Sequence, residues 1–576
     1  MVSVTIDGIK VEVAENTTVL KAAHKAGIKI PTLCYLEGVN AIGSCRMCLV
    51  EIENARGLQA ACVMPVSDGM VINTNSKRVR DTRRMNLELI LSNHDRDCLT
   101  CKRNYNCELQ ALAERFGVDG IRYEGEKTNN PIDITSPSIR REPNKCVLCR
   151  RCVAACNDVQ DIGAIGTTER GFKTIVEPVF KNSLADVPCI NCGRCVQACP
   201  CGALTVINDT DKVWEAINDP DKHVVVQTAP AVRAALGEAF CMPIGTRVTG
   251  KMATALKRLG FDKVFDTNFA ADLTIMEEGT ELLQRIKENH HLPMITSCSP
   301  GWVKYMEHYY EDFFENMSSC KSPQQMMGAI IKSYYAEMNN IDPKDIFVVS
   351  VMPCSAKKFE LQRPELVGDV DVSITTVELA EMIKQVGINF PELPDGEFDE
   401  VLGDSTGAGA IFGNTGGVME AALRTVYELV TKKSLENVEF NDVRGLAGVK
   451  EAEVDLDGTI VKVAVAHGTK NVKKLLNAIR EGKADYHFVE VMACPGGCIN
   501  GGGQPPITNE QILTYGDYRA LRAKAIYEED EANTIRKSHE NPSIQKLYED
   551  FLGEPGGHKS HDLLHTTYEK RGKYHY

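Results

Sequence analysis

Three cysteine-bearing segments in the second half of the chain carry residue types that could hold an inorganic cluster. Each segment places a thiol next to Pro or Gly, or within two residues of one, and such residues let the backbone turn tightly around a bulky group. Thiolates are protein ligands for iron and zinc. The simpler alternative is that the cysteines of these segments are buried structural residues. The segments are TSCSPGW at 296–302, MPCSAKKFE at 352–360 and EVMACPGGCINGGG at 490–503.

Cysteine usage over the whole chain favours metal binding. The chain has 22 Cys in 576 residues, many of them separated by two residues. Such a count suits either a disulfide scaffold or metal ligation. The first residues, MVSVTIDGIK, lack the basic and apolar regions of a secretory signal. We therefore expect a cytoplasmic protein whose thiols bind metal.

Charge and hydropathy argue against two classes of function. The net charge is −14, whereas nucleic-acid binding needs a basic surface to neutralise phosphates. The sequence has no uninterrupted apolar run of about 18 residues, the length that a membrane span requires. We therefore expect no nucleic-acid partner and no membrane span.

The first 78 residues combine a hairpin, a helix and four cysteines. Alternating apolar residues on both sides of Asp7-Gly8 predict a hairpin, and Thr17-Thr18 is placed to cap a helix that Gly27 ends. The cysteine spacing, C-x10-C-x2-C-x13-C, resembles a plant-type ferredoxin with a 2Fe-2S cluster, although the first gap is longer than usual. A zinc site is the alternative. The predicted ligands are Cys34, Cys45, Cys48 and Cys62.

A histidine and three cysteines form the next group, after a helical run at 83–91. Imidazole and thiolate both bind iron or zinc, so the residue types alone leave the metal open. The spacing, H-x3-C-x2-C-x5-C, resembles the His-ligated 4Fe-4S site of large iron-iron hydrogenases and of a related complex I subunit. The resemblance implies an outer electron-transfer cluster. The ligands would be His94, Cys98, Cys101 and Cys107.

An internal repeat between 145 and 204 predicts two more clusters. Two C-x2-C-x2-C-x3-C runs match the bacterial two-cluster ferredoxin pattern, in which the fourth Cys of each run ligates the other cluster. One cluster is therefore assigned to Cys146, Cys149, Cys152 and Cys199. The other is assigned to Cys156, Cys189, Cys192 and Cys195.

Beyond Lys222, strand-like apolar runs alternate with helical patterns. The segments 223–226 and 346–351 predict buried strands, and 377–386 predicts a helix. This alternation predicts an α/β domain with ligands at the loops that follow the strands. The cysteine-bearing segments should therefore lie at strand ends.

The three cysteine segments together resemble the active-site signature of the iron-iron (FeFe) hydrogenases. The resemblance covers almost the whole chain and includes Ala229-Pro230, TIMEE at 274–278, KSPQQ at 321–325 and GAGAIFG at 407–413. It implies reversible conversion of protons and electrons to H2. The implied cofactor is an H-cluster, a 4Fe-4S cube joined to a two-iron subsite with carbon monoxide, cyanide and azadithiolate ligands. One 2Fe-2S cluster and three accessory 4Fe-4S clusters would carry the electrons.

The resemblance also assigns roles to single residues. Cys354, Cys494 and Cys498 are implied ligands of the cube, with Cys498 as the bridge to the two-iron subsite. Lys357 is expected to donate a charge-assisted hydrogen bond to a cyanide. Plain core packing is the alternative for the two methionines among the residues expected to line the pocket. Those residues are Pro230, Ala231, Gln324, Met352, Phe412 and Met492.

A proton relay is implied along Cys298, Glu278, Ser318, Glu281 and Arg285. Glu278 and Glu281 are three residues apart, so on a helix both carboxylates fall on one side. For Glu281 alone, a solvated helix face is the alternative. The set as a whole favours proton transfer between the cluster and the surface.

Two positions depart from the family pattern. Ser299 stands where the family usually has a cysteine ligand of the cube, and a hydroxyl is a poorer ligand than a thiolate. The fourth ligand then has three options: Cys298, Ser299 itself, or Cys320, which stands where stand-alone members have Ala. We expect Cys298 to remain the proton shuttle. Ala231 replaces a Ser of many members.

Ser299 and Cys320 make the chain similar to the catalytic subunits of NAD(P)-linked, electron-bifurcating hydrogenases. Stand-alone ferredoxin-dependent enzymes share the same order of domains. No G-x-G-x-x-G follows a predicted strand, so nicotinamide chemistry would reside in another subunit. The implied partners are ferredoxin or NAD(P)-linked flavin and iron-sulfur subunits, H2 and protons as substrates, and maturation proteins.

Two other functions share parts of the pattern. A complex I-like electron-wiring subunit would have the N-terminal clusters but no use for Lys357 or for the pair Cys494 and Cys498. An H2 sensor would have the catalytic segments, but the complete relay and electron chain favour turnover.

The expected architecture is multidomain α/β and α+β. It begins with a β-grasp 2Fe-2S ferredoxin-like domain at 1–78 and a His/Cys-ligated 4Fe-4S domain at 79–125. A two-cluster ferredoxin-like domain follows at 138–209, then the α/β H-cluster domain at 220–520. A helical segment similar to the hydrogenase small subunit ends the chain at 521–576.

Overall fold

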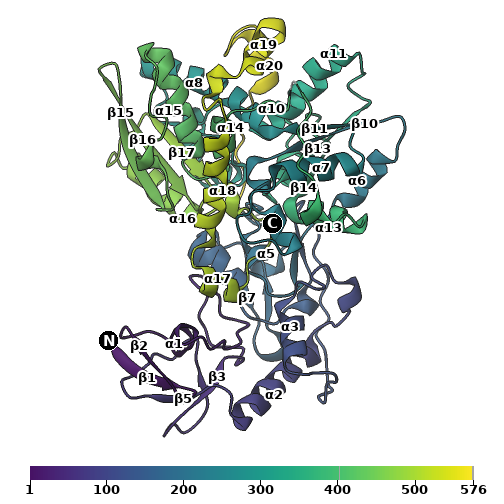
Figure 1. Cartoon of the computed structure of the whole chain (residues 1–576), viewed down its shortest axis with the longest axis vertical. Helices are drawn as coiled ribbons and strands as arrows, with labels where there is room; N and C mark the ends of the chain where they lie inside the picture. Colours follow the sequence, from purple (N-terminus) through teal and green to yellow (C-terminus); the bar gives the residue numbers. More distant parts are fainter. Residues whose placement is uncertain (401, 574–576) are drawn as a thin grey trace. The chain divides into compact units, whose positions relative to one another are not determined.

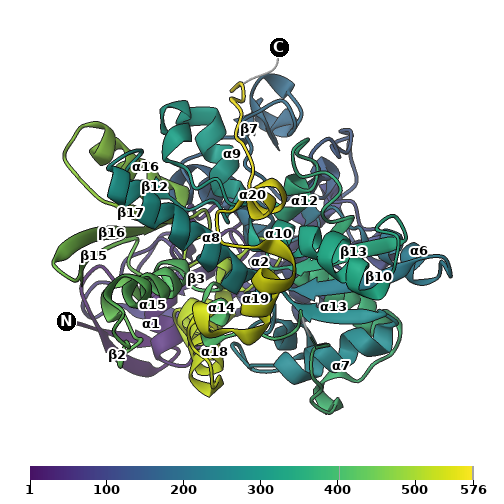
Figure 2. The ribbon, with the colours of Figure 1, turned by 90° about the horizontal axis from the view of Figure 1, so that it is seen from above.

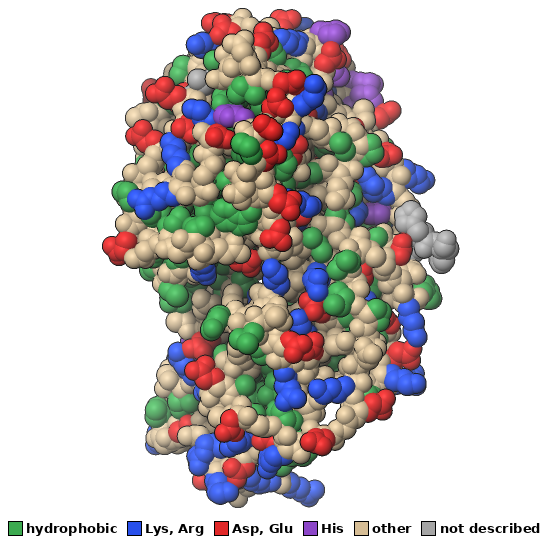
Figure 3. Space-filling model, turned by 90° about the vertical axis from the view of Figure 1, so that its right-hand side faces the viewer, with side chains coloured by type: hydrophobic (Ala, Val, Ile, Leu, Met, Phe, Trp, Pro, Cys, Tyr) green, Lys and Arg blue, Asp and Glu red, His purple; other side chains and the backbone are tan. Residues whose placement is uncertain are grey.

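The computed structural model describes residues 1–400 and 402–573, which belong to two compact units (Figure 1). The first unit comprises Met1–Val187, Arg194–Thr205 and Pro506–Gly516. The second comprises Pro188–Gly193, Val206–Pro505 and Asp517–Tyr576. Among the described helices, none has the length and apolar character needed to span a bilayer. Acidic and basic side chains are interspersed over the face shown in Figure 3.

The first unit begins with a five-stranded sheet in the order β2-β1-β5-β3-β4. The predicted hairpin is confirmed, because β1 and β2 pair antiparallel around Asp7 and Gly8, both with positive φ. Thr18 caps helix α1 by accepting a hydrogen bond from the Lys21 amide, as the sequence predicts. The elements are β1 Val2–Ile6, β2 Ile9–Val13, α1 Val19–Lys25, β3 Leu49–Ile52, β4 Gln59–Ala60 and β5 Val71–Asn73.

Short helices separated by cysteine-bearing loops make up the rest of the first unit. The helical run predicted at 83–91 lies inside α2. A small antiparallel pair, β7 with β8, follows the first cysteine run of the repeat. The elements are α2 Lys77–Asn93, α3 Glu108–Arg115, β6 Ile139–Arg141, α4 Arg151–Ala154, β7 Gly166–Thr168, β8 Ile175–Glu177, α5 Arg194–Ala198 and α17 Asn509–Tyr515.

The second unit contains two four-stranded sheets. One has the order β11-β10-β13-β14 and is parallel throughout. The other has the order β12-β17-β16-β15, in which only β15 runs antiparallel to its neighbour. The strands are β10 His223–Thr228, β11 Lys263–Asp266, β12 Met294–Ile295, β13 Ile346–Met352, β14 Val372–Thr375, β15 Val449–Leu456, β16 Thr459–His467 and β17 Phe488–Met492. The strands predicted at 223–226 and 346–351 are therefore confirmed.

Helix α8, Thr267–Glu288, runs between the two sheets (Figure 2). Its Ile275 packs in the core of the β16 and β17 side, and its Phe269 packs in the core of the β10 and β13 side. The other helices include α13, which confirms the predicted helix at 377–386 to within a residue. They are α6 Thr210–Ile217, α7 Thr249–Leu259, α9 Pro300–Tyr309, α10 Pro323–Ile330, α11 Ala336–Asn339, α12 Lys357–Glu360, α13 Thr376–Gln385, α14 Gly407–Ile411, α15 Gly417–Thr431 and α16 Thr469–Arg480.

The C-terminal segment is anchored to α8 by a buried carboxylate. Asp272 accepts hydrogen bonds from the Ser538 hydroxyl at 2.7 Å and from the Asn541 amide at 3.0 Å. Burial raises the pKa of Asp272 to about 6, although these hydrogen bonds oppose the rise. Helices α18 Tyr518–Ala532, α19 Pro542–Leu547 and α20 His558–Leu564 belong to this segment.

Candidate active site and electron-transfer sites

The four N-terminal cysteines converge in the structure. The Cys34 amide donates to the Cys45 Sγ at 3.4 Å, and hydrogen bonds from the Cys45 and Cys62 thiols lower the pKa of Cys34. Cys62 also bonds to Cys48. Four free thiols joined in a chain of hydrogen bonds fit a 2Fe-2S cluster.

Asn40 connects this loop to the first cysteine run of the repeat, within the first unit. Its side-chain amide donates to the Cys34 carbonyl at 2.7 Å and to the Cys149 carbonyl at 3.0 Å. The predicted 2Fe-2S ligands and the first cysteine run of the repeat are therefore joined by the Asn40 side chain.

His94 ends helix α2 as its C-cap residue, and its side chain fits a metal-binding role. It is buried, and within the described residues its Nδ1 has no hydrogen-bond partner. Burial lowers the pKa of His94, which favours the neutral imidazole that a metal needs. Cys98 and Cys107 line the same cavity. The fourth predicted ligand, Cys101, does not line this cavity, and its Sγ lies against Gly202, where a Cβ would be 2.5 Å from it.

The first cluster of the repeat has its four predicted ligands around one cavity. Cys146, Cys149, Cys152 and Cys199 all line it. Cys201 also lines it, but its thiol donates to the Lys145 carbonyl at 3.1 Å. Of the other set, Cys156 and Cys195 belong to the first unit and Cys189 and Cys192 to the second. Their assignment to one cluster continues to rest on spacing.

The three catalytic segments follow parallel strands, as the sequence predicts. Strand β12 leads to Cys298, β13 to Cys354 and β17 to Cys494. The carboxyl ends of parallel strands are the usual place for a ligand in such sheets.

Backbone contacts hold these segments together. The Ala493 amide donates to the Ser299 hydroxyl at 3.3 Å, and the Gly503 amide donates to the Pro353 carbonyl at 2.8 Å. Gly501 allows the second contact, because a Cβ there would lie 2.1 Å from the Pro353 carbonyl oxygen. The loop that carries Cys494 and Cys498 therefore lies directly against the turn that carries Cys354.

The Cys298, Cys354 and Cys498 side chains are partly buried and lie close enough to affect one another's pKa. Burial and the neighbouring Cys354 raise the pKa of Cys498 to about 12, and the Lys357 ammonium opposes the rise. Cys298 and Cys498 both pack against a core cluster that includes Ala231, Phe412 and Met492. Such a dry, sulfur-lined setting fits a metal cluster, whose own charge would favour the thiolates.

Other residues predicted to line the pocket are buried in the β11-β10-β13-β14 sheet or in the turn that follows β10. Pro230 and Ala231 begin the turn after β10, where the Ala231 carbonyl accepts a hydrogen bond from Gln504 at 2.8 Å. Met352 packs in the core of the β10–β14 sheet. The two methionines therefore belong to different cores.

Lys357 and Gln324 are joined by Glu360. The Lys357 Nζ donates to Ser322 at 2.7 Å, to Glu360 at 2.9 Å and to the Cys298 carbonyl at 3.3 Å. Gln324 donates to the same Glu360 oxygen at 2.9 Å. An ammonium group has three hydrogens, and all three are used here. To bind another ligand, Lys357 would have to give up one of these bonds, and the longest is the bond to the Cys298 carbonyl.

Three of the predicted relay residues, Glu278, Glu281 and Arg285, lie on α8, and Ser318 and Cys298 lie in loops outside it. Glu278 is 2 % exposed, and burial raises its pKa to about 8 while the Ser318 hydroxyl opposes the rise. Ser318 donates to Glu281 at 3.1 Å, and Arg285 donates to the other Glu281 oxygen at 2.6 Å. Burial, followed by the Glu278 charge, raises the pKa of Cys298. The expected geometry of both carboxylates on one helix side is confirmed.

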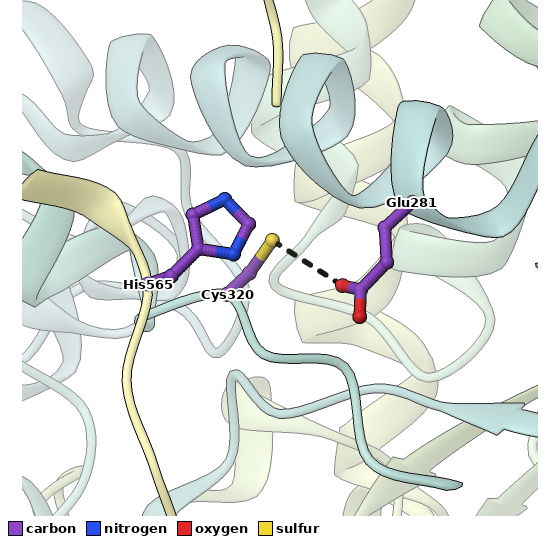
Figure 4. A group of neighbouring side chains, drawn as sticks. All are labelled: Glu281, Cys320 and His565. Atoms are coloured by element: carbon purple, nitrogen blue, oxygen red, sulfur yellow. Dashed lines mark hydrogen bonds between the residues drawn. The ribbon is translucent and has the colours of Figure 1, made fainter. Parts of the chain in front are cut away.

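Cys320 lies next to Glu281 of the predicted relay. Its Sγ is 3.9 Å from a Glu281 oxygen, and His565 lies on its other side (Figure 4). His565 and Glu277 were not among the residues singled out from the sequence. Glu277 lies within the TIMEE segment at 274–278, but no pattern in the sequence pairs it with His565, because the contact joins α8 to the distant C-terminal segment.

Comparison with known families accounts for nearly the whole chain. Residues 222–502 match the C-terminal domain of the iron-only hydrogenase large subunit, and 516–571 match the iron hydrogenase small subunit. Three iron-sulfur families match the N-terminal half. They are a 2Fe-2S cluster binding domain at 1–77, the NADH-ubiquinone oxidoreductase-G iron-sulfur binding region at 83–122 and a 4Fe-4S dicluster domain at 145–203.

Individual relatives extend over the same range. The chain is 52 % identical to the NADP-reducing hydrogenase subunit HndD of Solidesulfovibrio fructosivorans, over 99 % of each chain. It is 44 % identical to iron hydrogenase 1 of Clostridium pasteurianum, over 99 % of this chain and 100 % of that one. A solved variant of the FeFe-hydrogenase HydA1 of Chlamydomonas reinhardtii superimposes with a TM-score of 0.56 at 44 % identity, covering 64 % of this chain and all of that one.

Proposed function

The chain belongs to the iron-only (FeFe) hydrogenase family, and from this premise we propose which residues carry its reaction and which partners it serves. It is an oxidoreductase that interconverts H2 with protons and electrons. Its family has an H-cluster, and its N-terminal half holds 2Fe-2S and 4Fe-4S clusters for electron transfer.

For the H-cluster we assign Cys354, Cys494 and Cys498 as ligands of the cube, with Cys498 as the bridge. The contact of Gly501 and Gly503 with Pro353, which brings the Cys354 and Cys498 segments together, carries this assignment. Ser299 is the fourth ligand in this proposal, because its hydroxyl already faces the amide next to Cys494. Cys320 is left out, since its thiol faces Glu281. The two-iron subsite would carry carbon monoxide, cyanide and azadithiolate.

The H-cluster, when bound, supplies the metal chemistry that makes or splits H2 and exchanges protons with the protein. The chain's residues then move the proton. Cys298 passes it to Glu278, and Ser318 connects Glu278 to Glu281, which Arg285 holds at the outer end. A Glu278 pKa of about 8 suits this role, because near neutral pH the carboxyl can both donate and accept. Pro230, Ala231, Gln324, Met352, Phe412 and Met492 would enclose the subsite.

Electrons would travel through one 2Fe-2S cluster and three accessory 4Fe-4S clusters. The proposed ligands of the first three groups are those whose geometry is described above. The fourth group is Cys156, Cys189, Cys192 and Cys195, assigned by its spacing. The bond of Asn40 to both Cys34 and Cys149 supports a short path between two of the clusters.

The proposed electron partner is ferredoxin. A second candidate is an NAD(P)-linked complex in which flavin and iron-sulfur subunits reduce the nucleotide. The 52 % identity over 99 % of both chains to a subunit named as NADP-reducing favours it. We further propose a cytoplasmic location, where thiols stay reduced, and maturation proteins that install the two-iron subsite.

Two assays test this function. Protein produced with maturation proteins should evolve H2 from a reduced low-potential dye and take up H2 with an oxidised one, and absence of both activities in iron-replete protein would contradict the proposal. Native purification then separates the partners: co-purifying subunits with H2-dependent NADP reduction favour the complex, and direct exchange with ferredoxin favours the stand-alone enzyme.

A further inference from the structure

Cys320, His565 and Glu281 form a compact group of side chains that can ligate a metal. One ligand atom from each lies within 4.8 Å of the other two, and the Cys320 thiol points between the His565 ring and the Glu281 carboxylate (Figure 4). Thiolate, imidazole and carboxylate are the three ligand types of protein zinc sites. Because a thiolate is a soft ligand, the set disfavours Mg²⁺ and Ca²⁺.

The backbone places Cys320 and His565 side by side. The two residues form an antiparallel bridge. On either side of it the Lys321 amide donates to the Leu564 carbonyl and the Thr566 amide donates to the Ser319 carbonyl, both at 2.7 Å. The Ser297 hydroxyl fixes the Cys320 carbonyl at 2.6 Å. Metal binding would therefore need little movement of the chain.

A second carboxylate, that of Glu277, orients the His565 imidazole through its Nε2. The His565 Nε2 lies 3.1 Å from an oxygen of Glu277, and Glu277 is held in turn by the Tyr548 hydroxyl and the Gly556 amide. Metal-binding histidines usually have such a partner on the nitrogen that does not bind the metal. The other nitrogen, Nδ1, lies 2.7 Å from the Ser319 hydroxyl, which also bonds to Glu281. Nδ1 is thus on the side of the other two ligands.

The charge of the group also suits a divalent cation. A Cys320 thiolate and the Glu281 carboxylate would together balance two positive charges. The other His and carboxylate group of the described residues, Glu428 with His539 and Glu540, has no thiol.

We propose that Cys320, His565 Nδ1 and Glu281 bind a zinc-class divalent metal, with water as the fourth ligand, and that the bound metal blocks turnover by holding Glu281. A metal-bound carboxylate cannot accept the proton that Ser318 delivers. The inhibition rests on the proposed proton relay, whereas the binding does not.

Zinc binding is tested on the holoenzyme with its full iron content. The protein is equilibrated with zinc chloride and desalted, and its zinc is measured by elemental analysis and X-ray absorption. The wild type should retain one zinc ion per chain with one sulfur neighbour at about 2.3 Å. Cys320→Ala and His565→Gln should lose it, while Cys241→Ala, which removes an exposed thiol, and His539→Gln should keep it. Equal zinc in wild type and Cys320→Ala, or a spectrum without sulfur, overturns the site.

Inhibition is tested by H2 evolution from a reduced dye with and without zinc chloride. Zinc should lower wild-type turnover by about the 10²-fold of a lost proton-transfer group, and a chelator should restore it. The ratio of rates with and without zinc should approach unity in Cys320→Ala. If zinc binds through Cys320 without slowing turnover, the proposed inhibition is wrong. The zinc site then stands, and the proton does not pass through Glu281. Equal inhibition of wild type and Cys320→Ala overturns the assignment of the inhibitory site.

Discussion

The Ser318 hydroxyl donates a hydrogen bond to Glu281 at 3.1 Å, on the side of α8 that also carries Glu278. The Ser318 amide in turn donates to the Ile295 carbonyl at the end of β12, the strand that leads to Cys298. Ser318 therefore connects the end of β12, which leads to Cys298, with helix α8, which carries Glu278 and Glu281. In the proposed relay, a proton would pass between them inside the protein.

Replacing Glu278 by Gln removes the only titrating group between Cys298 and Ser318 in the proposed relay. Turnover in H2 evolution should fall by about 10²- to 10⁴-fold, the usual loss for a general acid-base group. The infrared and paramagnetic spectra of the clusters should stay as in the wild type. Glu288→Gln, an exposed residue at the end of the same helix, is the control and should keep full activity. Full activity of Glu278→Gln would place the relay elsewhere.

The pH dependence of the two directions should differ. Glu278 has a pKa of about 8 because it is buried, so below pH 8 it is mostly protonated and above pH 8 mostly ionised. H2 evolution needs a donor and should decline as the pH rises through about 8, whereas H2 oxidation needs an acceptor and should rise over the same range. Rates in both directions from pH 6 to 9 at fixed driving force measure this. Profiles that Glu278→Gln leaves unshifted would contradict the assignment.

Gly501 is predicted to be required for H-cluster assembly. A Cβ at this position would lie 2.1 Å from the Pro353 carbonyl oxygen, so Gly501→Ala must push the Cys498 loop away from Cys354. Overpacking of this kind costs about 1–3 kcal/mol, and here it also separates cluster ligands. Infrared carbonyl and cyanide bands should be lost while the accessory clusters remain. Gly120→Ala, where a Cβ meets open space, should keep the bands.

His94→Ala should separate electron transfer from catalysis. If His94 is a ligand of the outer cluster as proposed, its loss should slow electron exchange with ferredoxin, but isotope exchange between H2 and water should persist because it needs only the catalytic segments. His24→Ala, in helix α1 of the same unit, should leave both reactions intact. Equal loss of both reactions in His94→Ala would assign His94 to folding.

The sequence predicted those features that depend on neighbours in the chain. The cysteine runs, the hairpin at Asp7-Gly8 and the shared helix side of Glu278 and Glu281 all follow from spacing within a few residues. The strand-end position of Cys354 followed from the strand predicted at 346–351, whereas the strand before Cys494 was not predicted and is known from the structure.

Contacts between distant segments could not be predicted in this way. His565 contacts Cys320 because the C-terminal segment packs against the segment that contains Cys320, and no local sequence pattern predicts this packing. The sequence left Cys320 as a possible cube ligand for the same reason. Its neighbours Glu281 and His565 become visible only in the folded chain.

In the proposed mechanism Cys298 moves protons and Cys498 holds the two-iron subsite, and the infrared spectra of the two alanine variants distinguish these roles. Cys298→Ala should retain the carbonyl and cyanide bands while its turnover falls by at least about 10²-fold. Cys498→Ala should have no such bands. Loss of the bands in Cys298→Ala, or their persistence in Cys498→Ala, would contradict the account.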